Sequence, residues 1–221
     1  MDTLIINYFH SHLFRTKMII NVRYKKSHMI DPNTNMNGEE FEAYNIRRWG
    51  SSSWTNSLIR SGRTVGANFT NWQTWPNTLR AHQLIDYVTN PKGEEKVGEG
   101  RKILPSASEC NAAIFNAMYE CGANVSLVDT LVTIGVEKLG ITNTEILRSH
   151  LETNAGSKAV MSEIQLGRNK YNIGGVPYFI VGAIVDEDGG RKVVGTSYEL
   201  SGAQESGAFV NMFDELAKRL I

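Results

Sequence analysis

The stretch that decides the fold is "NIGGVPYFIV", residues 172–181, where two glycines and a proline come directly before aromatic and β-branched residues. The run from Tyr178 to Val185 has the composition of a β-strand. Glycine reaches positive φ without strain, and a cis bond before proline sharpens a turn. Gly174 and Gly175 therefore predict that the chain leaves a helix through positive φ, approaches a partner closely, and then enters this strand.

The residues that follow predict a β-hairpin and a closing helix. The segment "PYFIVGAIVDEDGGRKVVGTSYEL", residues 177–200, contains two strand-like runs that meet at a turn between Asp186 and Gly190. Beyond it, apolar residues recur at helical spacing, which predicts a last helix with one buried face: Phe209, Met212, Phe213, Leu216 and Leu220.

Upstream of the hairpin, the pattern is almost entirely helical. Apolar spacing of three and four residues predicts helices across Phe41–Trp49, Ala81–Val88 and Val160–Tyr171, while "MIINVRYK" at 18–25 is a strand candidate. We therefore divide the chain into three parts. They are an N-terminal arm with a strand at 1–37, a helical insertion at 38–172 and a C-terminal half at 173–221.

Composition excludes some partners. Lys plus Arg and Asp plus Glu both total 23 in 221 residues, so no global field attracts the chain to nucleic acid or to an anionic membrane. The longest apolar runs are too short to span a bilayer, and the N-terminus has an acid where a signal peptide carries positive charge. We expect a cytoplasmic protein. His10 and His12 have no further ligand beside them, so no metal site is predicted.

Cys110 and Cys121 are the only cysteines. Their spacing places both on one apolar stripe of a helix, where they would be buried. On a continuous helix they are separated by roughly 16 Å of rise, too far for a disulfide, which needs Cα atoms within about 7 Å. We interpret them as small core residues and not as a redox pair.

Four stretches, read together, resemble one known family. They are "YKKSHMIDPNTNMNGEE" (24–40), "WPNTLRAHQL" (75–84), "NIGGVPYFIV" (172–181) and "LSGAQ" (200–204). In this order they are similar to the DsbA-like thioredoxin-fold family, in the branch of FrnE-type dithiol oxidoreductases and, more distantly, 2-hydroxychromene-2-carboxylate isomerases and kappa-class glutathione transferases. The resemblance implies an α/β, thioredoxin-like fold with a large helical insertion.

The resemblance also implies roles for particular residues. It gives Val176 and Pro177 the place of the family's cis-proline loop, whose backbone pairs with an extended substrate. It places the helix start at Asn77, Thr78 and His82 near the mouth of the active site, where these three would line a substrate pocket. An N-cap asparagine and a hydrogen-bonded histidine explain the same residues structurally, and the sequence does not separate the two interpretations.

The chain differs from the family because it lacks the residues that carry out the family's reaction. The family's nucleophile is a Cys-x-x-Cys at a helix N-terminus, and no such motif occurs here, so no catalytic residue is predicted. The family's first strand and active-site helix also have no counterpart before Met18. We expect residues 3–9 either to pair antiparallel with 18–25 or to form an irregular arm. We expect the missing strand to leave a gap between 18–25 and the hairpin, in a chain that is either an incomplete gene product or a form that fills the gap from elsewhere.

Three functions follow from these observations. The first is a DsbA-like thiol-disulfide oxidoreductase scaffold that is redox-inactive in this chain and needs no cofactor. The second is a glutathione-dependent isomerase or transferase, with glutathione bound near Val176. The third is a non-catalytic module that binds extended peptide. In each case the expected partner is a thiol- or disulfide-containing protein or a small thiol.

Overall fold

The computed structural model describes residues 3–6, 19–24, 33–89, 105–174, 177–187, 190–202 and 204–218. It is a mixed α/β structure, mostly helical, with two small antiparallel sheets. The chain forms two compact units, one of Met29–Met161 and one that joins Met1–His28 to Ser162–Ile221. The three ranges 1–37, 38–172 and 173–221 stay a prediction.

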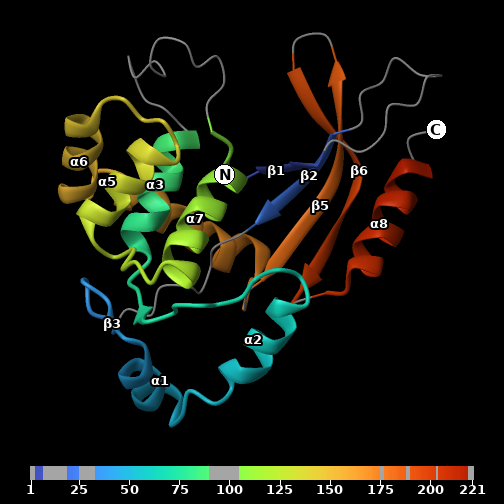
Figure 1. The fold of residues 1–221 in the computed structure, drawn as a ribbon. Helices are drawn as coiled ribbons and strands as arrows, with labels where there is room; N and C mark the ends of the chain where they lie inside the picture. The colour runs from blue at the N-terminus through green and yellow to red at the C-terminus, as the bar shows by residue number, and fades with distance from the viewer. Residues whose placement is uncertain are drawn as a thin grey trace. The chain divides into compact units, whose positions relative to one another are not determined.

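The second unit contains a four-stranded sheet (Figure 1). Its strands, in spatial order, are β1 (Thr3–Ile6), β2 (Ile19–Tyr24), β5 (Tyr178–Glu187) and β6 (Gly190–Ser201), and every neighbouring pair is antiparallel. The predicted hairpin is confirmed, since β5 and β6 pair from Tyr178–Ser201 to Glu187–Gly190. The predicted antiparallel pairing of the N-terminal segment with 18–25 is confirmed by β1 and β2.

The predicted gap in this sheet is wrong. β2 pairs directly with β5, from Ile19 opposite Ile184 to Tyr24 opposite Phe179. A strand's backbone N–H and C=O groups need partners, and pairing β2 with β5 provides them along six residues. The sheet is therefore continuous from β1 to β6, and no open edge remains between the N-terminal strands and the hairpin.

The closing helix α8 (Ser206–Lys218) covers the hairpin, as predicted. Met212 and Leu216 are buried with Val181 of β5, and the rings of Phe179 and Phe209 meet edge to face at 5.0 Å. Figure 1 shows α8 running beside β5 and β6. Leu220, also assigned to this face, lies outside the described residues.

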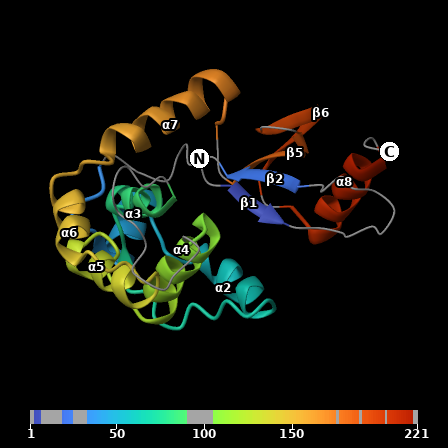
Figure 2. The same cartoon turned by 90° about the horizontal axis from the view of Figure 1, so that it is seen from above.

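In its described residues, the other unit contains helices and one short two-stranded sheet. The helices are α1 (Phe41–Trp49), α2 (Thr55–Arg63), α3 (Leu79–Thr89), α4 (Ala107–Phe115), the π-helix η1 (Asn116–Glu120), α5 (Val128–Glu137) and α6 (Thr144–Glu152), most of which are labelled in Figure 2. The boundary between the two units, at residues 161 and 162, falls within the next helix, α7 (Ser157–Tyr171). The strands are β3 (Glu39–Glu40) and β4 (Thr74–Trp75). The predicted helices at 41–49, 81–88 and 160–171 are confirmed.

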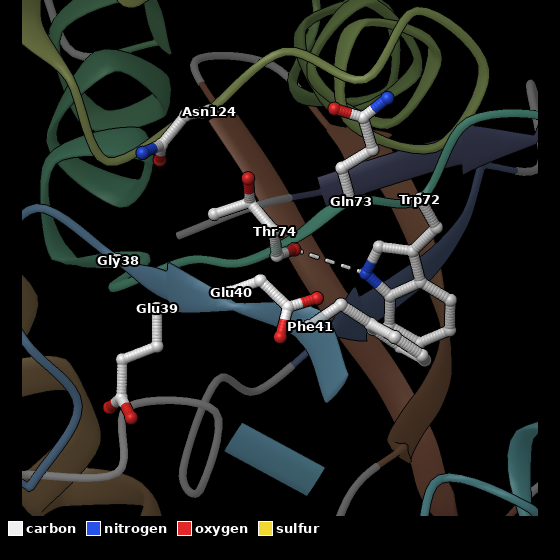
Figure 3. A pocket seen from close by; sticks show the side chains of 8 residues that line it. All are labelled: Gly38, Glu39, Glu40, Phe41, Trp72, Gln73, Thr74 and Asn124. Carbon is white, nitrogen blue, oxygen red and sulfur yellow. Dashed lines mark hydrogen bonds between the residues drawn. The ribbon is translucent and has the colours of Figure 1, made fainter. Parts of the chain in front are cut away.

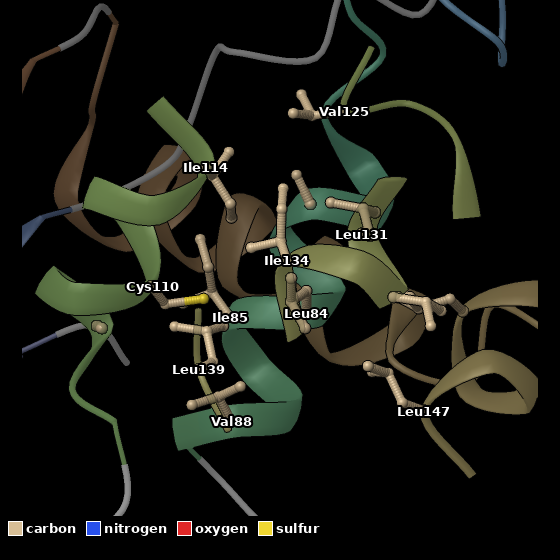
Figure 4. Packing of buried hydrophobic residues seen from close by; sticks show 14 of the residues in the cluster. Leu84, Ile85, Val88, Cys110, Ile114, Val125, Leu131, Ile134, Leu139 and Leu147 are labelled. Atoms are coloured by element: carbon tan, nitrogen blue, oxygen red, sulfur yellow. The ribbon is translucent and has the colours of Figure 1, made fainter. Parts of the chain in front are cut away.

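The core of this unit surrounds α3 (Figure 4). Leu84 of α3, Leu131 of α5 and Leu147 of α6 are fully buried together. Gly135 allows α5 to approach α6, because a Cβ at this position would lie 2.5 Å from Cδ2 of Leu147. This core fixes the position of α3. In the described part of the chain, no helix has the length and apolar character needed to cross a bilayer.

Candidate functional site

A pocket of about 620 Å³ opens where the β3–β4 sheet meets the start of α1 (Figure 3). Its walls come from Gly38 to Phe41, from Trp72 to Thr74, and from Asn124. Residues 38–41 and 72–74 are brought together by the pairing of Glu39 with Trp75 and of Glu40 with Thr74. The amide N–H of Phe41 also donates to the carbonyl of Gln73, at 2.9 Å, which closes the junction.

Two adjacent carboxylates in this lining have different environments. Glu39 accepts two hydrogen bonds from Arg47 Nη2, the shorter at 2.7 Å, and one from Arg47 Nε, so its charge is already neutralised. Glu40 is the N-cap of α1, and its carboxylate accepts from the backbone N–H groups of Glu42 and Ala43. These two hydrogen bonds lower the pKa of Glu40. Glu40 is therefore ionised at neutral pH and has no cationic partner among these contacts.

Aromatic rings form the other side of the pocket. Phe41 and Trp72 lie 4.6 Å apart with an interplanar angle of 55°. Trp72 stacks on Trp75 at 5.7 Å, and Trp75 stacks on Tyr44 of α1 at 4.3 Å. Figure 3 shows the side chains of Phe41 and Trp72 on the same side of the strands as the Glu40 carboxylate. This series of rings holds β4 against α1 and makes the wall rigid.

Three side chains of the lining donate a hydrogen bond inside the protein. Trp72 Nε1 donates to the carbonyl of Thr74, at 3.2 Å, and Asn124 Nδ2 donates to the carbonyl of Asn37, at 2.7 Å. Gln73 Nε2 donates to the side-chain oxygen of Asn71. The single indole N–H of Trp72 is therefore used, while the amides of Asn124 and Gln73 each have a second N–H.

The floor of the pocket is tightly packed. Gly38 has a φ of +78°, and a Cβ there would lie 2.9 Å from the Ser126 hydroxyl and 3.1 Å from Asn124 Oδ1. Only glycine satisfies both the left-handed backbone and this close approach. The same Ser126 hydroxyl accepts a hydrogen bond from the backbone N–H of Asn77. Ser126 therefore contacts both the pocket residue Gly38 and the residues that precede α3.

Asn77 is a buried structural residue at the start of α3. Its Oδ1 accepts from the N–H of Leu79, and its Nδ2 donates to the carbonyl of Thr34, at 3.2 Å. Only 6% of Asn77 is exposed. Nδ1 of His82 lies 2.7 Å from the carbonyl of Thr78, so this nitrogen donates and carries the proton. These contacts agree with the structural interpretation of the three residues, and none of the three lines the pocket described above.

The proline loop belongs to the other compact unit. The carbonyl of Pro177 accepts from the N–H of Gly202, at 2.8 Å, which fastens the start of β5 to the end of β6. Val176 and Gly175 lie outside the described residues. Gly174 does not have the positive φ that we predicted. The left-handed residue at the end of α7 is Asn172, with a φ of +48°, because asparagine tolerates this region and can end a helix there.

The two cysteines have different environments. Both are free, and Cys110 is buried in the core, as predicted. The prediction that Cys121 is buried on the same stripe is wrong, since Cys121 is exposed. The reason is the π-helix at Asn116–Glu120, whose wider turn rotates the following residues off the α-helical stripe.

The lining of the pocket contains no cysteine or histidine. The hydrogen bonds from Glu42 and Ala43 lower the pKa of Glu40 and hold its carboxylate in the ionised form at neutral pH. Within the described ranges, no group of three or more His, Cys, Asp or Glu is arranged to hold a metal ion. His10 and His12 lie outside those ranges.

Comparison with known proteins places this chain in no family: no protein-family model matches it, and no curated protein matches it.

Sequence reasoning missed this pocket. The available signal was the aromatic pair in "WQTW" (72–75) together with two glutamates before Phe41. Neither feature predicts a pocket by itself, because the two segments lie more than thirty residues apart. Only their pairing as β3 and β4 brings the carboxylates and the rings to one place.

Proposed function

We propose that this chain is a DsbA-like thioredoxin-fold protein that binds a thiol- or disulfide-containing polypeptide at the Pro177 loop and does not catalyse disulfide exchange. The observation that carries the proposal is the order of elements in one compact unit. A β-strand precedes the helical region, and an antiparallel hairpin that starts directly after Pro177 follows it, covered by a closing helix. This order is the one that the four resembling stretches predict.

The cysteines support the redox-inactive part of the proposal. Disulfide exchange needs an accessible thiolate, and in this family a second cysteine resolves the mixed disulfide. Cys110 is buried among apolar side chains, which disfavours its thiolate. Cys121 is exposed, but no second thiol accompanies it, since the only other cysteine is in the core. The chain therefore has no pair of neighbouring cysteines that could alternate between the dithiol and the disulfide form.

The Pro177 loop supports the binding part of the proposal. The carbonyl of Pro177 is occupied by Gly202, so the loop is fixed at one end by the hairpin. Residue 176, which the family resemblance assigns to backbone pairing with the substrate, comes directly before this fixed point. A position that is already fixed at one end loses less conformational freedom when an extended peptide pairs with the residue before it.

A reductase assay tests the redox part. We expect the chain, with dithiothreitol as reductant, to reduce insulin disulfides at the uncatalysed rate. A rate above that background would show that one of the two cysteines acts as a nucleophile and would overturn this part of the proposal.

A binding assay tests the rest and separates the alternatives. We expect an extended cysteine-containing peptide to bind the chain. Pro177→Ala keeps the backbone carbonyl that accepts from Gly202 but frees φ at this position, and it should weaken this binding by about tenfold. Gly207→Ala is the matched control, since a Cβ there meets nothing within 4 Å. Binding of glutathione without binding of the peptide would favour the isomerase or transferase alternative. Binding of neither would contradict the proposal.

A further inference from the structure

The pocket between β3, β4 and α1 has acidic side chains in its lining but no basic ones. The one N–H of Trp72, and one N–H each of Gln73 and Asn124, donate to protein acceptors. The lining includes the carboxylates of Glu39 and Glu40 and no lysine or arginine. An anion therefore finds no positively charged side chain in this lining to offset its desolvation.

Glu40 gives the pocket a negative charge that no basic side chain of the lining neutralises. A carboxylate has about four lone-pair positions, and the backbone N–H groups of Glu42 and Ala43 occupy two of them. The remaining positions face solvent at the pocket, since Glu40 is exposed. Glu39, by contrast, is held by the fork of Arg47, so the lining retains the charge of one carboxylate.

The neighbouring rings favour the same kind of ligand. The negative face of an aromatic ring attracts a cation within about 6 Å of its centroid, and tryptophan does so most strongly. Phe41 and Trp72 are half-buried, so they present ring surface to the pocket and are held in place by their neighbours. Their packing keeps this wall fixed before any ligand arrives.

We infer that this pocket binds a cationic organic group, a guanidinium or an alkylammonium, with Glu40 as its counter-ion and Phe41 and Trp72 as its apolar wall. The inference is independent of the thiol chemistry, because all of these residues lie in the unit of Met29–Met161. The same cation can come from an arginine or lysine side chain of a polypeptide or from a free small amine.

Calorimetric titration of the whole chain with three probes tests the inference. N-acetyl-arginine amide represents the side chain, propylguanidinium represents a free small cation of the same charge, and N-acetyl-citrulline amide is a neutral compound of almost the same shape as the arginine amide. We expect saturable binding of both cations, and binding of the citrulline amide at least about tenfold weaker, because charge-assisted hydrogen bonds are the stronger kind. Tighter binding of the arginine amide identifies a side chain as the source, and tighter binding of propylguanidinium identifies a free small cation.

Two variants locate the binding. Glu40→Gln removes the proposed counter-ion and should weaken binding of the arginine amide by about tenfold or more. Glu42→Gln is the matched control, because it removes the same charge from the same helix without altering the lining, and its affinity should change by less than about threefold. Circular dichroism shows whether each variant is folded.

Three results would overturn the inference. They are no saturable binding of either cation below about 10 mM, equal binding of the arginine and citrulline amides, and unchanged binding in a folded Glu40→Gln variant. The comparison of probes on the unaltered chain decides the question even if Glu40→Gln does not fold.

Discussion

The substitution Asn77→Ala tests how the start of α3 is held. It removes the side-chain acceptor for Leu79 N–H at the start of α3, and loss of such a hydrogen bond at a helix start costs about 1 kcal/mol. It also removes the donor to the carbonyl of Thr34, a residue that is only 5% exposed. A buried acceptor left without a partner costs about 1–3 kcal/mol. We therefore expect the free energy of unfolding to fall by about 2–4 kcal/mol.

The assay is urea unfolding at pH 7 followed by far-ultraviolet circular dichroism, which reports the helices directly. Asn143→Ala is the matched control. Asn143 caps α6 through one hydrogen bond to Ile146 N–H and is exposed, so its loss should cost only about 1 kcal/mol. If the two variants lose stability to within about 0.5 kcal/mol of each other, the buried contact to Thr34 contributes nothing and the reasoning is refuted. If Asn77→Ala instead has unchanged stability but binds the cysteine-containing peptide more weakly, the result would support Asn77 as a residue of a substrate pocket.

Two further predictions concern the π-helix. The carboxylate of Glu120 accepts from the Thr70 hydroxyl and from the backbone N–H groups of residues 68–70, and these bonds lower its pKa from the ordinary 4.5. Its contribution to stability is therefore present above pH 4.5 and is lost as the pH falls through the lowered value. Urea midpoints measured from pH 6 to pH 3 should fall less steeply in Glu120→Gln than in the unaltered chain, and parallel curves would contradict this role. In native protein, dithionitrobenzoate should modify Cys121 rapidly and Cys110 only on unfolding, and rapid modification of both would contradict the burial of Cys110.

Local patterns in the sequence were enough to determine several elements. Two runs of strand-like composition on either side of a turn that contains Gly189 and Gly190 predict the β5–β6 hairpin, because aromatic and β-branched residues favour strands. Spacing of three and four residues likewise determines α3 and the buried face of α8. Each of these features depends on residues that are close together in the chain.

Features that depend on distant pairing or on a change of helix type were not determined by the sequence. Whether residues 19–24 pair with β5 or leave a gap depends on which backbone partners are available in the folded sheet. The exposure of Cys121 depends on a π-turn that α-helical spacing does not represent.

The candidate pocket needs the tertiary structure most of all. Its carboxylate, Glu40, and its indole, Trp72, come from segments that meet only when β3 pairs with β4. The sequence by itself therefore determined the hairpin, the main helices and the absence of a Cys-x-x-Cys. The tertiary structure decided which side chains share a site, because hydrogen bonding between strands distant in the chain, and not local periodicity, brings them within reach.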